Sequence, residues 1–127
     1  MRVNSYQDCW VEYTPRALNN RGLQQPMTCE VRPYTGAEWH AHKVANLQRM
    51  SNDLGEAERV TTQTLIERVR NIRNMTVVVH TADGETERPV RTGADFVAYA
   101  PDELQIDVLD AINKASTMQE GLGKKSK

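Results

Sequence analysis

The sequence predicts a single α+β domain in which a small antiparallel sheet, made of two hairpin-like strand pairs, packs against about three amphipathic helices. Three observations predict this class. Two segments near the N-terminus alternate along a strand, the middle of the chain repeats apolar residues at helical spacing, and a β-branched run precedes a turn dipeptide. The length of 127 residues suits one domain, expected over residues 1–118 with a disordered Lys-rich tail at 119–127.

The first strand pair is predicted from two segments with the alternation of half-buried strands, Asp8–Tyr13 and Met27–Arg32. Residues 16–26 between them are polar and are interpreted as a loop. Because that loop is too long for a tight turn, the strands are expected to pair antiparallel through a longer connection. On the first strand, one face is expected to carry Cys9, Val11 and Tyr13, and the other Trp10 and Glu12.

Two helices are predicted to follow. Thr35 and Glu38 have the spacing of a capping box, in which each side chain bonds the other residue's backbone N–H group, and they open a helix over residues 36–50. A break at residues 51–55 separates it from a second helix over residues 56–72. The apolar stripe of the second helix consists of Ala57, Val60, Leu65, Ile66, Val69 and Ile72.

The second strand pair is predicted from the strongest strand sequence of the chain, Met75–Thr81, which contains a run of β-branched residues. Asp83-Gly84 is a hairpin turn dipeptide, and the chain is expected to return as a short strand over Glu87–Arg91. Pro89 lacks an N–H group, so this returning strand must lie at an edge.

The C-terminal part is predicted to be helical. Residues 93–99 are expected to form a short helix, and Pro101 suits the first turn of a final helix, where Asp102 and Glu103 complement its positive end. The residues expected on its buried face are Leu104, Val108, Ala111, Ile112 and Ala115, with Ile106 and Leu109 widening that face.

The composition argues against several classes of protein. The 16 Lys and Arg residues balance 17 Asp and Glu residues, so no nucleic acid partner is expected, because nucleic-acid-binding domains are usually strongly basic. No apolar run approaches the ~20 residues that cross a bilayer, and the N-terminus lacks an export signal, so no membrane association is expected. The chain is therefore expected in a reducing cytoplasm, with Cys9 and Cys29 as buried thiols.

No pattern predicts an enzyme, a cofactor or a metal site. His40 and His42 are two positions apart, which on a helix places them about 200° apart and prevents them from sharing one metal ion. His80 lies among valines and is expected at the surface or at the edge of the core. The sequence has no glycine-rich phosphate loop and no Gly-x-Ser-x-Gly turn.

Two sets of large side chains each have two interpretations. One set could contact nucleic acid or form a solvated helix face paired with acidic residues, and the solvated face is favoured. This set is Arg59, Arg68, Arg70 and Arg73. The second set either fills the core or serves in part as a surface for a partner. It consists of Trp10, Tyr13, Tyr34 and Trp39.

Two segments resemble the tail assembly chaperones of long-tailed bacteriophages. The first is Val31-Arg32-Pro33-Tyr34-Thr35-Gly36-Ala37-Glu38, a strand followed by a capped helix, which is similar to an "RPLTxxE" entry common in that family. The second runs from Thr92-Gly93-Ala94-Asp95 through Ala100-Pro101-Asp102-Glu103-Leu104 and an acidic amphipathic helix to the Lys-rich tail. Together the two segments cover about half of the chain.

The resemblance implies a non-enzymatic protein of the host cytoplasm. Such chaperones bind the tape-measure protein, keep its long hydrophobic helices from aggregating, and help to recruit tail-tube subunits. Exposed apolar stripes on helices suit such a client. The residues expected to bind it are Val60, Leu65, Val69, Ile72, Leu104, Val108 and Ile112. The alternative is that the two stripes bury one another in the core. Whether the chain forms a homo-oligomer stays open.

Two other functions compete with the chaperone. The first alternative is a structural accessory protein of the virion, in the tail, neck or capsid of a phage. A chaperone leaves the finished particle and an accessory protein stays in it, so the composition of the virion distinguishes them. A small enzyme or metal-binding regulator is a third class, and a metal site would require Cys9 or Cys29 to meet a histidine in the fold.

Overall fold

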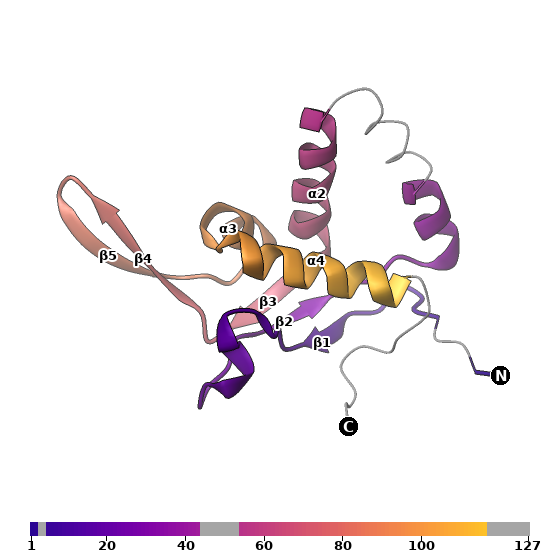
Figure 1. The fold of residues 1–127 in the computed structure, drawn as a ribbon, viewed down its shortest axis with the longest axis horizontal. Coiled ribbons are helices and arrows are strands. Elements are labelled where there is room, and N and C mark those ends of the chain that lie inside the picture. The colour runs from indigo at the N-terminus through magenta and orange to yellow at the C-terminus, as the bar shows by residue number, and fades with distance from the viewer. Residues whose placement is uncertain (3–4, 44–53, 117–127) are drawn as a thin grey trace.

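The structure, a computed structural model, describes residues 1–2, 5–43 and 54–116. Within these residues the chain forms helices and two small antiparallel sheets, one of three strands and one of two, so the predicted α+β class is confirmed. Figure 1 shows a body in which the helices lie mainly over one side of the three-stranded sheet, and the two-stranded sheet projects from this body as a ribbon.

The three-stranded sheet has the order β1-β2-β3, with β1 at Val11–Tyr13, β2 at Thr28–Val31 and β3 at Val69–Arg73. Each strand is antiparallel to its neighbour. The predicted pairing of the first two strands is confirmed, in a register that places Val11 opposite Val31. The inner face of this sheet and its flanks supply core residues, namely Met27, Cys29, Val31, Val69 and Ile72.

Strand β3 corrects the prediction of one helix over residues 56–72. Helix α2 covers Leu54–Arg68, and the chain then pairs with β2. Val69 and Ile72 are buried while the two residues between them are exposed, because the register of β2 and β3 is irregular there and Asn71 has a φ of +50°. This irregularity spaces the buried residues three apart, which imitates a helix in the sequence.

The segment interpreted as a loop, residues 16–26, contains the 3-10 helix η1 at Ala17–Gly22, which corrects that interpretation. The Asp107 carboxylate accepts hydrogen bonds from two backbone N–H groups at the start of η1, at 2.6 and 2.8 Å. The buried Asn20 side chain bonds both the N–H group and the carbonyl of Met27. Because Asp107 is so distant in the sequence, local composition does not reveal this helix.

The helix predicted after β2 begins where expected. Its described part covers residues 36–43, and the capping box is confirmed. The Thr35 N–H group donates to Glu38 Oε1 at 2.9 Å, and the Glu38 N–H group donates to Thr35 Oγ1 at 3.2 Å. The predicted continuation to residue 50 lies outside the described residues, and the last two residues of the predicted break at 51–55 belong to α2.

Strands β4 at Thr76–Thr81 and β5 at Gly84–Pro89 form the ribbon. The predicted hairpin is confirmed, with Pro89 on an edge strand, although the returning strand starts earlier than predicted. The turn residues are Ala82–Asp83. Gly84 follows them with a φ of +124°, a conformation that a side chain would strain.

Helices α3 at Gly93–Tyr99 and α4 at Asp102–Ser116 confirm the predicted C-terminal helices. Every residue predicted on the buried face of α4 is buried, but Ile106 is 57% exposed and does not widen that face. Phe96 of α3 and Leu65 of α2 are fully enclosed in the core. The predicted tail at residues 119–127 lies outside the described residues.

Candidate protein-interaction surface

The structure places all but one of the residues expected to bind a client in the core. Val60 is half-buried and the others are buried. The buried ones belong to one hydrophobic cluster, which contains Leu65, Val69, Ile72, Leu104, Val108 and Ile112. This arrangement agrees with the alternative interpretation, in which the two stripes bury one another. In this conformation the buried side chains of this cluster present no surface to a partner.

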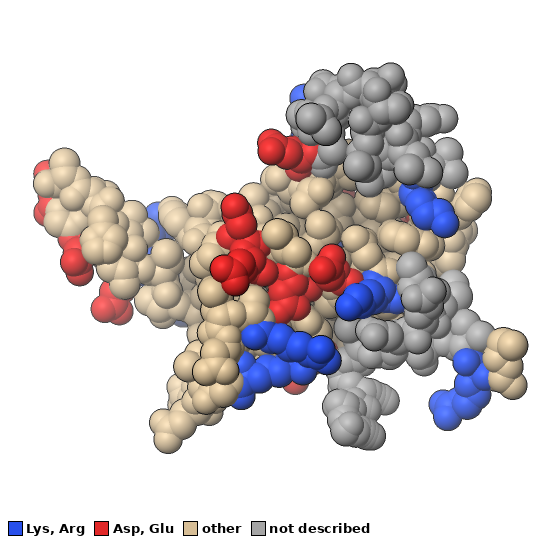
Figure 2. Space-filling model, in the orientation of Figure 1, with Lys and Arg blue, Asp and Glu red and all other residues tan. Residues whose placement is uncertain are grey.

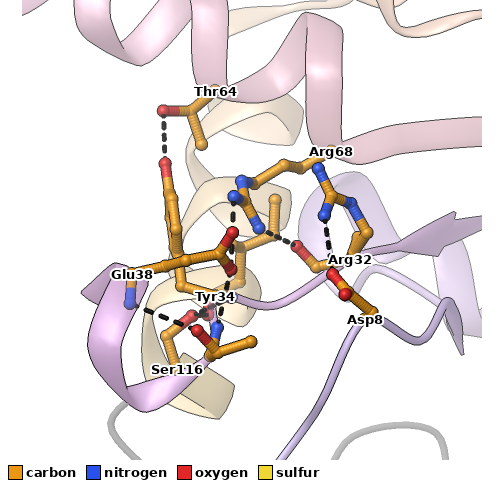
Figure 3. Close-up of polar contacts among 9 residues, drawn as sticks. Asp8, Arg32, Tyr34, Glu38, Thr64, Arg68 and Ser116 are labelled. Carbon is orange, nitrogen blue, oxygen red and sulfur yellow. Dashed lines mark hydrogen bonds and ion pairs between the residues drawn. The ribbon is translucent and has the colours of Figure 1, made fainter. Parts of the chain in front are cut away.

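A buried arginine lies beside this core (Figure 3). Arg68, the last residue of α2, is only 6% exposed, so the prediction of a solvated helix face is wrong for Arg68. Its guanidinium carbon lies 3.6 Å from the centre of the Tyr34 ring, which is a cation–π contact. The guanidinium also donates to the Arg32 carbonyl at 3.1 Å and lies 3.6 Å from Glu38 Oε1.

Tyr34 connects four elements at this point. Its N–H group donates to Ser116 Oγ on α4 at 2.9 Å, and its hydroxyl lies 3.0 Å from Thr64 Oγ1 on α2. Its ring stacks on His42 in helix 36–43, with 4.6 Å between the ring centres. Because Tyr34 also follows β2 closely, this one residue, through its backbone N–H group and its side chain, links β2, helix 36–43, α2 and α4.

Glu38 completes this group, which we call the polar junction: Tyr34, Glu38, Thr64, Arg68 and Ser116. The backbone N–H group of Thr35 and the charge of Arg68 lower the pKa of the Glu38 carboxyl below its ordinary value, although partial burial opposes this. The polar groups of the junction bond to one another and to nearby backbone. It is therefore suited to hold elements together rather than to receive a ligand.

The outer face of the three-stranded sheet carries a different set of side chains. Successive residues of a strand point to opposite faces, so Glu12 and Glu30, which are paired across β1 and β2, point away from the core. Arg70 of β3 is paired with Glu30 on the same face. By alternation and cross-strand pairing, together with the contacts of Arg32 and Arg70 on Trp10, the outer face consists of Trp10, Glu12, Thr28, Glu30, Arg32, Arg70 and Arg73.

Two arginines contact the tryptophan of the outer face. The guanidinium carbon of Arg70 lies 4.0 Å from the centre of the Trp10 ring, and that of Arg32 lies 5.8 Å from it. Arg70 Nε donates to Glu30 Oε1 at 2.9 Å, and this bond lowers the pKa of the Glu30 carboxyl. Trp10 is half-buried, so part of its ring remains open to solvent beside these charges.

Only part of the outer face follows from the sequence. Strand alternation alone places Trp10 and Glu12 on one face. The contribution of β3 is missed, because its residues are predicted to be helical. Asn71 and Asn74 are the residues that could have located the end of the helix, since asparagine adopts the left-handed conformation readily and both have a positive φ here.

The other candidate residues are dispersed over the fold. Cys29 is buried, and burial raises the pKa of its thiol to about 12. Cys9 is exposed, so the prediction of a buried thiol is wrong for Cys9. His80 is exposed on the ribbon, with Nδ1 3.6 Å from Glu85 Oε1. Among residues 1–2, 5–43 and 54–116, no three His, Cys, Asp or Glu side chains are placed to hold a metal ion.

Comparison with family models, with curated proteins and with solved structures finds no match. Within the part of the chain that the structure describes, no helix is both long enough and apolar enough to cross a membrane.

Proposed function

We propose that this chain is a tail assembly chaperone of a long-tailed bacteriophage. It binds the tape-measure protein in the host cytoplasm, assists assembly of the tail tube, and catalyses no reaction. The resemblance of segment 31–38 to the tail assembly chaperones supports the proposal, because the characteristic residues of this segment make specific contacts in the fold. Thr35 and Glu38 cap a helix, and Tyr34 joins four elements. Segment 31–38 therefore contributes to the packing of the helices and strands against one another.

The outer face of the sheet is the observation that carries the proposal. Trp and Arg are enriched at the residues that contribute most to binding in protein interfaces. Trp10, with Arg32 and Arg70 against its ring, combines an apolar surface with charges that keep the free face hydrated. A helix packed on a sheet is a common arrangement of layers, so an amphipathic client helix suits this face, with its apolar side against Trp10 and polar residues near the charged side chains.

The composition of the finished virion tests the proposal. A chaperone acts during assembly and then leaves, so mass spectrometry of purified virions should detect no peptides of this chain. The lysate of infected cells should contain them, and the tail-tube protein serves as a positive control in both samples. Presence of the chain in virions at a fixed ratio to the tail-tube protein contradicts the proposal and favours an accessory protein of the particle.

A further inference from the structure

The ribbon formed by β4 and β5 has two edges, and its hydrogen bonding shows which backbone groups point to each. The Val90 N–H group donates to the Met75 carbonyl at 3.0 Å, so these two residues form a hydrogen-bonded pair. Hydrogen-bonded and non-hydrogen-bonded pairs alternate along an antiparallel ladder. In the observed register, the residues whose backbone groups point outward are Thr76, Val78 and His80 on β4, and Glu85, Glu87 and Pro89 on β5.

The outer edge of β5 is protected against a further strand. Pro89 has no N–H group to offer to a neighbour, and Glu85 and Glu87 place negative charge along the same edge. Every residue of β5 is exposed. Figure 2 shows acidic side chains at the tip of the ribbon and along one of its edges.

The outer edge of β4 has none of these protections. Residues 77–79 are three valines, and Val78 is 44% exposed although it lies in the middle of the strand. Among the described residues, β5 is the sole strand paired with β4. Folded proteins rarely leave such an edge free, because its unpaired N–H and carbonyl groups are a template for another strand. The edge of β4 is therefore expected to have an occupant.

We propose that the occupant is the same edge of a second copy of this chain, so that two β4 strands pair antiparallel about Val78. Val78 then lies opposite its own counterpart, and Thr76 lies opposite the counterpart of His80. These are the residues whose backbone groups point outward, so the pairing forms about six new hydrogen bonds between the copies. Val77 lies opposite the counterpart of Val79, which brings β-branched side chains together. The contact is isologous, with one patch serving both copies.

The distribution of charge favours a second copy as the occupant. His80 is the one residue of β4 with an ionisable side chain, whereas the carboxylates of the hairpin lie in its turn and on β5. In a four-stranded sheet of order β5-β4-β4-β5, the acidic strands lie outermost and about 14 Å apart. This separation exceeds the Debye length of ~8 Å in physiological salt, so the repulsion between them is largely screened.

Sedimentation velocity over a range of protein concentrations tests the dimer. Val78→Pro removes an outward N–H group from β4 and takes no hydrogen bond from the ribbon, and Glu87→Pro makes the matched change directly across on β5. The unaltered chain and Glu87→Pro are expected to dimerise as concentration rises, while Val78→Pro stays monomeric. A dimer of Val78→Pro, or an unaltered chain that stays monomeric at its highest soluble concentration, overturns the proposal.

A cross-link tests the register without proline. Val78→Cys in a Cys9→Ser background is expected to yield a disulfide-linked dimer on mild oxidation, because the two positions lie opposite each other across the proposed interface. Glu87→Cys in the same background is the control and should yield little. Equal cross-linking of the two variants contradicts the pairing of β4 with β4. The dimer does not require the tape-measure protein, so its failure leaves the proposed function standing.

Discussion

Arg68 shows how a single charged side chain can join the parts of a small body. Its guanidinium lies over the Tyr34 ring, bonds the Arg32 carbonyl and faces Glu38, while the residue as a whole is buried. A buried cation is costly unless it is paired and hydrogen-bonded, and Arg68 meets both conditions. The residue therefore contributes through contacts between elements that are distant in the sequence.

Replacement of this side chain should be strongly destabilising. Arg68→Ala removes the cation–π contact, the hydrogen bond to the Arg32 carbonyl and the buried stem, and it should lower the free energy of unfolding by about 2–4 kcal/mol. Urea denaturation followed by circular dichroism measures this change.

Arg88→Ala is the matched control for Arg68→Ala. Arg88 also lies against a tyrosine, with its guanidinium carbon 5.4 Å from the centre of the Tyr99 ring, but it is exposed on the ribbon. Its replacement should change the free energy of unfolding by less than about 0.5 kcal/mol. Equal losses in the two variants would show that the polar junction has no special weight in the fold.

Gly93 sets the distance between two helices. Helix α3 begins at Gly93, where a Cβ atom would lie 2.6 Å from the Ile66 carbonyl oxygen and 2.7 Å from that of Leu65. These neighbours are backbone atoms of α2 and cannot move aside as a side chain can. Gly93→Ala should therefore force α3 away from α2 and lower the free energy of unfolding by about 3 kcal/mol.

Ala94→Ser provides the comparison for Gly93→Ala. Ala94 is the next residue of the same helix and is exposed, so its replacement should alter the free energy of unfolding by less than about 0.5 kcal/mol. Thermal and urea denaturation of both variants give the values. A Gly93→Ala protein as stable as the unaltered chain would contradict the close packing of α2 and α3.

Elements that depend on residues close together in the sequence could be predicted. Elements that depend on contacts between residues far apart in the sequence could not. The capping box at Thr35, the hairpin ending at Pro89 and the face of α4 each depend on residues close together in the chain. Strand β3 depends on pairing with β2, and its irregular register conceals its alternation. Helix η1 depends on Asp107, about ninety positions away. The outer face of the three-stranded sheet takes residues from predicted strands and from β3, so it could be predicted only in part.

In the molecule as a whole, the residues that form the core differ from the residues proposed to contact partners. Most residues of the two apolar stripes form the core, although Val60 is half-buried and Ile66 is 38% exposed. Among the described residues, the surfaces that we propose for partners are the outer face of the three-stranded sheet and the outer edge of β4. The proposed client and the proposed second copy therefore occupy different parts of the protein and can bind at the same time.

Capture of the tape-measure protein tests the central claim most directly. The tagged chain and the tape-measure protein of the same phage are co-expressed, and the amount of tape-measure protein that copurifies in soluble form is measured. Trp10→Ala should lower this amount roughly tenfold or more, because it removes the aromatic residue of the outer face. Ile106→Ala, which truncates an exposed apolar residue of α4, is the control and should capture as much as the unaltered chain. Failure of the unaltered chain to capture the tape-measure protein, or equal capture by a folded Trp10→Ala variant, would contradict the account.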